Sequence, residues 1–252
     1  MTRAADGAGC SPLAGQLDVA ALAVPDWVAD LADGRLVRPV WRNELGGITY
    51  RLGDGARYLK AQPDDTGWDV AAEVARLAWV GRFVPAPRTL AHGERDGLRW
   101  LLTAGLPGRS AVDPLWQARP AVAVPALGRA LREFHDRVPA ASCPFSWSVA
   151  ERVARHGLDP ALVDDTPEPD AVVCHGDACN PNFLLGDDAA LTGYVDLGGL
   201  GVADRWADLA PALLSLGWNY GPGWEECFLS GYRIEPDEAK RAFYTALWNA
   251  ED

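Results

Sequence analysis

The sequence predicts an α+β fold with two lobes, in which a small, β-rich N-terminal lobe with one helix precedes a larger, mainly helical C-terminal lobe. Two observations support this prediction. Strand-like segments gather in residues 35–102, whereas apolar residues at helical spacing prevail after residue 120. The length of 252 residues is sufficient for two modest lobes, or for one large domain, with a buried core.

The N-terminal lobe is expected to span residues 25–105. It follows residues 1–24, where alanine, glycine and small polar residues predict a loosely ordered segment. A helix is expected over residues 69–80, where apolar residues recur at helical spacing. The expected strands, separated by turns such as the one at residues 93–97, are residues 37–41, 48–52, 57–60, 88–90 and 98–102.

The C-terminal lobe is expected to span residues 106–252. Helical spacing of apolar residues predicts helices over residues 122–138, 206–216 and 235–248. Residues 139–169 contain many acidic residues without clear periodicity, so a looser stretch is expected there.

Charge and cysteine content limit the possible partners and locations. The formal net charge of −12 argues against nucleic acid or an anionic membrane as a partner. It is compatible with a cationic small-molecule substrate, although the charge taken alone favours a surface that only keeps the protein soluble. Five cysteines without framework spacing, and no long apolar run, predict a cytoplasmic protein. It is expected to be a monomer or a homodimer.

A short hairpin is predicted in the middle of the chain. Residues 183–185 and 193–195 are apolar strand-like segments, and the turn at residues 186–188 separates them. This hairpin would bring Asn182 and Asp196 side by side at its open end. Because magnesium prefers oxygen ligands, an amide and a carboxylate placed in this way predict a Mg²⁺ site.

The spacing of these residues from Asp177 is the spacing that phosphoryl transfer requires. Asp177 would orient an attacking hydroxyl and accept its proton, while Asn182 and Asp196 hold the metal against nucleotide phosphates. His175 could be catalytic, but a structural role is favoured, in which its imidazole hydrogen bonds to the backbone and holds Asp177 in place.

Residues of the N-terminal lobe are expected to bind ATP. Lys60 ends a predicted strand and Glu73 lies on the next predicted helix, which is how a lysine is placed against the α- and β-phosphates. Tyr58 points to the same face as Lys60 and could stack on adenine, or simply pack. Three further features are expected to contact ATP. A weak glycine turn at Gly46 and Gly47 would approach the phosphates, a hinge at Thr103, Ala104 and Leu106 would offer backbone groups to the adenine, and Val195 would form an apolar floor.

Taken together, these residues resemble the aminoglycoside phosphotransferase family, particularly its 3′-hydroxyl, kanamycin-type branch. The resemblance runs from about Trp41 to Leu247. It implies a protein-kinase-like two-lobed fold, ATP with Mg²⁺, and an aminoglycoside hydroxyl as acceptor, with Asp177 as the base. The segments that carry it most clearly are residues 173–182, 201–210, 218–225 and 242–244.

The sequence departs from the family pattern where a substrate would bind. Gly199 stands where members often have arginine, and the usual acidic segments near the C-terminus are changed. Substrate amines would still need anionic, carbonyl or aromatic partners. The candidates are Asp177 itself with Trp218, Asn219, Glu225, Glu251 and Asp252.

Three functions therefore remain open. The first is an aminoglycoside kinase in antibiotic resistance, or one of narrowed specificity in aminoglycoside biosynthesis. The second is a kinase of another amino sugar or amine-bearing acceptor, since fold does not fix substrate. The third is a nucleotide-binding pseudokinase, against which the intact Asp177, Asn182, Asp196 and Lys60 argue.

Overall fold

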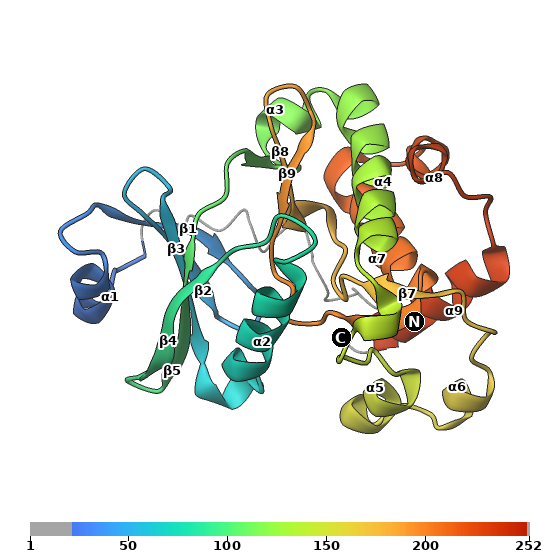
Figure 1. Cartoon of the computed structure of the whole chain (residues 1–252), viewed down its shortest axis with the longest axis horizontal. Helices are drawn as coiled ribbons and strands as arrows, with labels where there is room; N and C mark the ends of the chain where they lie inside the picture. The colour runs from blue at the N-terminus through green and yellow to red at the C-terminus, as the bar shows by residue number, and fades with distance from the viewer. Residues whose placement is uncertain (1–21, 251–252) are drawn as a thin grey trace, which may run out of the picture. The chain divides into compact units, whose positions relative to one another are not determined.

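The computed structural model of the chain describes residues 22–250, which divide into two compact units, residues 22–107 and residues 108–250 (Figure 1). The first unit is built around a β-sheet and the second is mainly helical, in agreement with the predicted α+β class. The segment predicted to be loosely ordered lies almost entirely outside the described residues.

An antiparallel sheet in the order β1-β2-β3-β5-β4 forms the N-terminal unit. Its strands are β1 (Val37–Arg42), β2 (Ile48–Leu52), β3 (Arg57–Pro63), β4 (Thr89–Arg95) and β5 (Leu98–Ala104). The predicted strands are confirmed, but the last turn is shorter than predicted. β4 continues through Gly93, and Asp96 and Gly97 alone make the turn, both with positive φ. Such a two-residue turn matches the twist of a hairpin.

Two helices cover opposite faces of this sheet, α1 (Asp26–Leu31) and α2 (Val70–Val80) (Figure 1). Because side chains alternate along β3, Leu59 packs into the core with Trp27 of α1, whereas Lys60 faces α2. The predicted helix over residues 69–80 is α2. The sequence did not reveal α1, because six residues are too few for a periodic apolar pattern.

The C-terminal unit contains helices around two small sheets. The helices are α3 (Pro114–Gln117), α4 (Pro120–Arg137), α5 (Val149–His156), α6 (Ala161–Asp164), α7 (Trp206–Tyr220), α8 (Glu225–Tyr232) and α9 (Glu238–Ala250). One sheet pairs β7 (Ala171–Cys174) with β10 (Gly201–Asp204); the other has the order β6-β8-β9, with β6 (Arg109–Ser110), β8 (Phe183–Leu185) and β9 (Leu191–Tyr194). Short 3₁₀ turns occupy Ala140–Ser142 and Asn180–Asn182 in this unit, and Asp64–Thr66 in the N-terminal unit. None of the described helices has the length and apolar character that crossing a membrane requires.

The stretch predicted to be loose, residues 139–169, contains two helices instead. The sequence carried a signal for α5, because Ser148 and Glu151 have the spacing of a capping box. The Ser148 hydroxyl accepts a hydrogen bond from the Glu151 N–H at 3.3 Å, and Gly157 ends the helix with a φ of +65°. Capping by Ser148 and Gly157 therefore sets both ends of this short helix.

Helices α4 and α8 pack with their backbones in close contact. A Cβ added to Gly128 of α4 would overlap the carbonyl oxygen of Phe228, and one added to Gly231 of α8 would overlap the backbone of Pro125. Glycine is needed at both positions because any side chain would push the helices apart.

Gly128→Ala is predicted to lower the free energy of unfolding by about 1–3 kcal/mol, because the added methyl group overpacks this contact. The matched control is Gly217→Ala in α7, where an added Cβ meets nothing within 4 Å. That change should raise stability by about 0.5–1 kcal/mol, through helix propensity alone. Denaturant unfolding of both variants measures the difference, and equal effects would contradict the packing argument.

Candidate active site

The loop that carries Asp177 (residues 175–182, the Asp177 loop) begins where β7 ends. Its second residue, Gly176, has a φ of +85°, and a Cβ at this position would overlap the backbone of Gly199. The reverse contact is also tight, since a Cβ on Gly199 would lie 2.9 Å from the Gly176 carbonyl oxygen. The two glycines allow the Asp177 loop to pass directly against the segment that follows Asp196.

A buried carboxylate on α7 holds the start of this loop. Asp208 is fully buried and accepts two backbone hydrogen bonds, from the N–H of His175 at 2.6 Å and from the N–H of Gly176 at 2.9 Å. Hydrogen bonds to an ionised acceptor are stronger than neutral ones. Asp208 therefore fixes the backbone of the two residues that immediately precede Asp177.

Asp208 is in turn held by a histidine on α4. Nε2 of His135 lies 2.9 Å from Oδ2 of Asp208, and Nδ1 of His135 lies 2.6 Å from the Tyr232 hydroxyl. Arg205, which can only donate, gives a hydrogen bond to the same hydroxyl at 3.0 Å. Tyr232 can thus give its own hydrogen to Nδ1, which leaves the Nε2–H of His135 to donate to Asp208. Burial raises the pKa of Tyr232 well above its usual value, so the hydroxyl keeps its proton.

The predicted role of the His175 imidazole is wrong. Both ring nitrogens are buried and, among the described residues, make no hydrogen bond. The ring instead stacks on Phe183, with centroids 6.0 Å apart and planes at 20°, and lies near Phe134. The backbone N–H of His175, and not its side chain, orders the loop.

The predicted hairpin is present and brings the two proposed metal ligands to the same end. Phe183 of β8 pairs with Tyr194 of β9, and the Val195 N–H extends the ladder to the Asn182 carbonyl at 2.9 Å. Asp196 follows with a φ of +59°, a left-handed conformation that aspartate tolerates better than most residues. Strain of this kind is concentrated at functional sites.

Asn182 also contacts the proposed base. Its Nδ2 donates to the Asp177 carbonyl oxygen at 2.9 Å and to Oδ2 of Asp177 at 3.0 Å. Burial raises the pKa of the Asp177 carboxyl, and the nearby charge of Asp196 raises it further. The structure therefore brings Asp177, Asn182 and Asp196 together; the hairpin geometry predicted this for Asn182 and Asp196, and the spacing of the motif for Asp177.

The same atoms fit a magnesium ion. Because Nδ2 of Asn182 is occupied by Asp177, its amide oxygen is the atom left to coordinate a cation. Asp196 is exposed and adds a carboxylate, so the pair offers the hard oxygen ligands that Mg²⁺ prefers.

In the N-terminal unit, the predicted lysine–glutamate pair is formed. Nζ of Lys60 on β3 lies 3.7 Å from Oε2 of Glu73 on α2, and the Glu73 side chain is only 6% exposed. Tyr58 is half-buried two residues before Lys60 on the same strand.

The glycine turn between β1 and β2 is braced internally. The Gly46 N–H donates to the Asn43 carbonyl at 3.2 Å, and the Gly47 N–H donates to Oδ1 of Asn43 at 2.6 Å. Any contact of these two amides with phosphate would have to replace those bonds.

The predicted hinge residues lie at the end of β5. Thr103 pairs with Tyr58, and the Ala104 N–H donates to the Arg88 carbonyl at 2.9 Å. Leu106 follows this strand, just before the two units divide at Pro107 and Gly108.

A family model described as "Phosphotransferase enzyme family" matches residues 46–244. The chain belongs to the phosphotransferase enzyme family. Among its relatives, an aminoglycoside 3′-phosphotransferase of Streptomyces fradiae is 32% identical over 81% of this chain and 91% of the relative. A streptomycin 3″-kinase of Streptomyces griseus is also 32% identical, over 88% of this chain and 91% of the relative.

Solved structures of the family agree. The crystal structure of an aminoglycoside 3′-phosphotransferase of type VIII has 29% identity and a TM-score of 0.72, and covers 89% of this chain and 98% of its own. A Streptomyces rimosus aminoglycoside phosphotransferase in complex with ADP and streptomycin has 28% identity and a TM-score of 0.65. The match covers 90% of this chain and 99% of that structure's chain. The predicted family resemblance and the protein-kinase-like fold class are confirmed.

Against this family background, Gly199 has a structural explanation. An arginine here would place its Cβ against the Gly176 carbonyl, so the backbone of the Asp177 loop would have to shift. The departure predicted from sequence to alter the substrate thus also permits the contact between these two glycines.

The proposed substrate residues are only partly placed. Trp218 and Asn219 lie near the end of α7, and Glu225 begins α8. Nδ2 of Asn219 donates to the Ser215 carbonyl at 2.8 Å, and the Ser215 hydroxyl accepts from the Asn180 N–H in the Asp177 loop at 2.9 Å. Asn219 is therefore linked to the loop through one serine. Glu251 and Asp252 lie outside the described residues.

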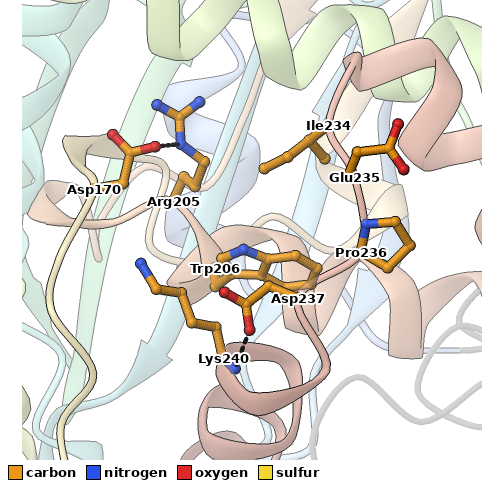
Figure 2. A pocket seen from close by; sticks show the side chains of 8 residues that line it. All are labelled: Asp170, Arg205, Trp206, Ile234, Glu235, Pro236, Asp237 and Lys240. Atoms are coloured by element: carbon orange, nitrogen blue, oxygen red, sulfur yellow. Dashed lines mark hydrogen bonds and ion pairs between the residues drawn. The ribbon is translucent and has the colours of Figure 1, made fainter.

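A separate cavity of about 320 Å³ lies at the other end of β7, beside Asp170 (Figure 2). Its basic side chains are paired: Arg205 with Asp170 at 2.6 Å, and Lys240 with the buried Asp204 at 2.6 Å. The Lys240–Asp204 pair connects β10 to α9, and the Arg205–Asp170 pair joins the residues that flank β10 and β7, which indicates a structural role for the charges around this cavity.

Sequence reasoning missed Asp208 and His135 as members of the site. A signal existed, because Asp208 is an acidic residue in the apolar helical segment 206–216 and His135 lies on the apolar side of its helix. Buried polar groups require partners, so both residues invited a search for hydrogen bonds.

Asp208→Asn is predicted to lower the free energy of unfolding by about 1.5–3 kcal/mol and to reduce kcat. The amide has one acceptor oxygen instead of two and presents N–H groups to the backbone donors of His175 and Gly176. The control is Asp136→Asn, which removes the half-exposed partner of Arg132 and should change stability by less than about 1 kcal/mol. Unfolding and turnover measurements on both variants test this anchor, and an unaltered Asp208→Asn protein would refute it.

Asp177→Asn is predicted to stabilise the protein at neutral pH. Because the pKa of Asp177 is raised in the folded state, its ionisation disfavours folding as the pH rises through that pKa. The stability gained from asparagine should shrink as the pH falls from about 7 toward about 4. Denaturant titrations across this range, with the exposed Asp187→Asn as control, measure the trend. A gain that grew at acid pH would have the wrong sign.

Proposed function

We propose that this protein transfers the γ-phosphate of ATP to a hydroxyl of an aminoglycoside, with the 3′-hydroxyl as the expected acceptor. The observation that carries the proposal is the cluster of Asp177, Asn182 and Asp196 in a chain whose relatives are aminoglycoside phosphotransferases. The family and the fold support the transfer chemistry. The names of the relatives support the acceptor class.

In this reaction, Asp177 would accept the proton of the attacking hydroxyl. The hydroxyl oxygen forms a bond to the γ-phosphorus, the bond from that phosphorus to the ADP oxygen breaks, and the hydroxyl proton passes to the Asp177 carboxylate. A general base works best when its pKa lies near the operating pH, and the raised pKa of Asp177 moves it in that direction. Asp208 and Asn182 would keep the carboxylate aimed at the hydroxyl.

Asn182 and Asp196 would hold the magnesium ion through one amide oxygen and one carboxylate. Bound there, the ion would neutralise charge on the nucleotide phosphates. Lys60, held by Glu73, would bind the α- and β-phosphates, and Tyr58, Val195 and residues 103–106 would contact the base and ribose.

The net charge of −12 supports a polycationic acceptor, because the summed field attracts cations and repels nucleic acid. The relatives are divided over the hydroxyl, since both 3′- and 3″-modifying enzymes are 32% identical to this chain. We therefore infer that the residues near Gly199 and Asn219 determine which hydroxyl is phosphorylated. Through that choice they would determine whether the protein serves resistance or biosynthesis. A cytoplasmic location follows from the same proposal and is consistent with five cysteines that lack the spacing of a disulfide framework.

A panel of aminoglycosides incubated with the protein, ATP and Mg²⁺ tests the activity. Mass spectrometry should show addition of one phosphate to compounds that carry the accepted hydroxyl, and none to a congener that lacks the 3′-hydroxyl. Phosphorylation of that congener, or of streptomycin alone, would move the acceptor to another position. If only other amino sugars or amines were phosphorylated, they and not aminoglycosides would be the acceptor class.

In the same assay, Asp177→Asn should reduce kcat by about 10²–10⁴-fold with ATP affinity nearly unchanged, because only proton acceptance is lost. Asp196→Ala should instead weaken the Mg²⁺-dependent binding of ATP. Near-wild-type turnover in either variant would contradict these roles, and ATP binding without turnover on any acceptor would favour a pseudokinase.

A further inference from the structure

A tryptophan just before α2 contacts both members of the Lys60–Glu73 pair. Trp68 lies between the 3₁₀ turn Asp64–Thr66 and the helix cap Asp69, and its side chain is half-buried. The indole N–H donates to Oε2 of Glu73 at 2.6 Å. The ammonium of Lys60 lies 4.9 Å from the centroid of the same indole ring.

The shorter contact to Glu73 is the one from the indole. Nζ of Lys60 is 3.7 Å from Oε2 of Glu73, which is too long for a strong hydrogen bond, whereas the Trp68 N–H is 1.1 Å closer (3.7 minus 2.6 Å). A carboxylate with 6% of its side chain exposed requires donors to offset its lost hydration. Trp68 is a neutral donor, so it fixes the orientation of Glu73 without cancelling the charge that attracts Lys60.

The face of the indole stabilises the lysine in a complementary way. A cation over an aromatic face is attracted by the ring quadrupole, and this attraction adds to the one between Lys60 and Glu73. The backbone of Trp68 is fixed as well, because Nη1 of Arg99 on β5 donates to its carbonyl oxygen at 2.7 Å. The backbone that carries the ring is thus held by the sheet on which Lys60 lies.

We propose that Trp68 is a positioning residue that orients Lys60 and Glu73 for binding of the ATP phosphates. The inference rests on the proposed function, because Lys60 is taken to bind phosphate. Trp68 fixes the acceptor Glu73 with its N–H and holds the ammonium of Lys60 near its ring face. Loss of Trp68 should therefore weaken nucleotide binding specifically.

The experiment compares Trp68→Phe, which keeps a ring face but removes the N–H, with Trp68→Leu, which removes both. Calorimetric titration of ATP with Mg²⁺ should give a Kd raised about tenfold for Trp68→Phe, and about threefold more for Trp68→Leu. Once an acceptor is known, the KM for ATP should rise in parallel, while the KM for the acceptor stays within about twofold of wild type.

Two controls separate positioning from a loss of stability. Trp100→Phe on β5 changes a half-buried tryptophan of the same sheet, whose ring packs 6.3 Å from Trp27, and should leave the Kd for ATP unchanged. In a Glu73→Ala background, Trp68→Phe should alter the Kd by less than about twofold, because the acceptor of its N–H is already gone.

The outcomes distinguish this inference from the function on which it rests. If Lys60→Ala weakens ATP binding but Trp68→Phe does not, the role of Trp68 is wrong and the role of Lys60 stands. An equal effect of Trp68→Phe with and without Glu73, or of Trp100→Phe, also overturns the inference. If Lys60→Ala leaves ATP binding unchanged, the nucleotide role of Lys60 fails, and that of Trp68 fails with it.

Discussion

The carboxylate of Asp208 determines whether the Asp177 loop can exist in its present shape. The end of β7 leaves two backbone N–H groups pointing into the interior, where unpaired donors are costly. A single side chain with two acceptor oxygens satisfies both and thereby sets the direction in which the chain leaves the strand. His135 then supplies a donor to that carboxylate, so its burial is compensated from a second helix.

The N-terminal unit uses the same arrangement. Glu73 is also a buried carboxylate, and it too is held by a neutral N–H donor, the indole of Trp68, which is closer to it than the ammonium of Lys60. In both units the charged group is oriented by a residue that does not neutralise it. Such preorganisation is useful in phosphoryl transfer, because the protein contributes positioning and electrostatics rather than covalent chemistry.

Much of the fold could be predicted because its signals are local. The strands of the first unit alternate in polarity, and the apolar segments around residues 186–188 could hardly form anything except a hairpin, so Asn182 and Asp196 had to meet. The contacts of Asp208 could not be predicted, because they join residues 32 and 33 positions apart and depend on how α7 packs. The role of His175 was mistaken for a similar reason: sequence shows that a histidine is present, but not which of its atoms meets a partner.

Helix α8 has different constraints at its two ends. Its last residue, Tyr232, is hydrogen-bonded to His135, and Gly231 beside it lies against the backbone of α4, so this end cannot move without disturbing the support of Asp208. Its first residue, Glu225, lies about 10 Å away along the helix axis and has no such restraint from the glycine contacts. A substitution at the beginning of this helix should therefore disturb the support of Asp208 less than one at its end.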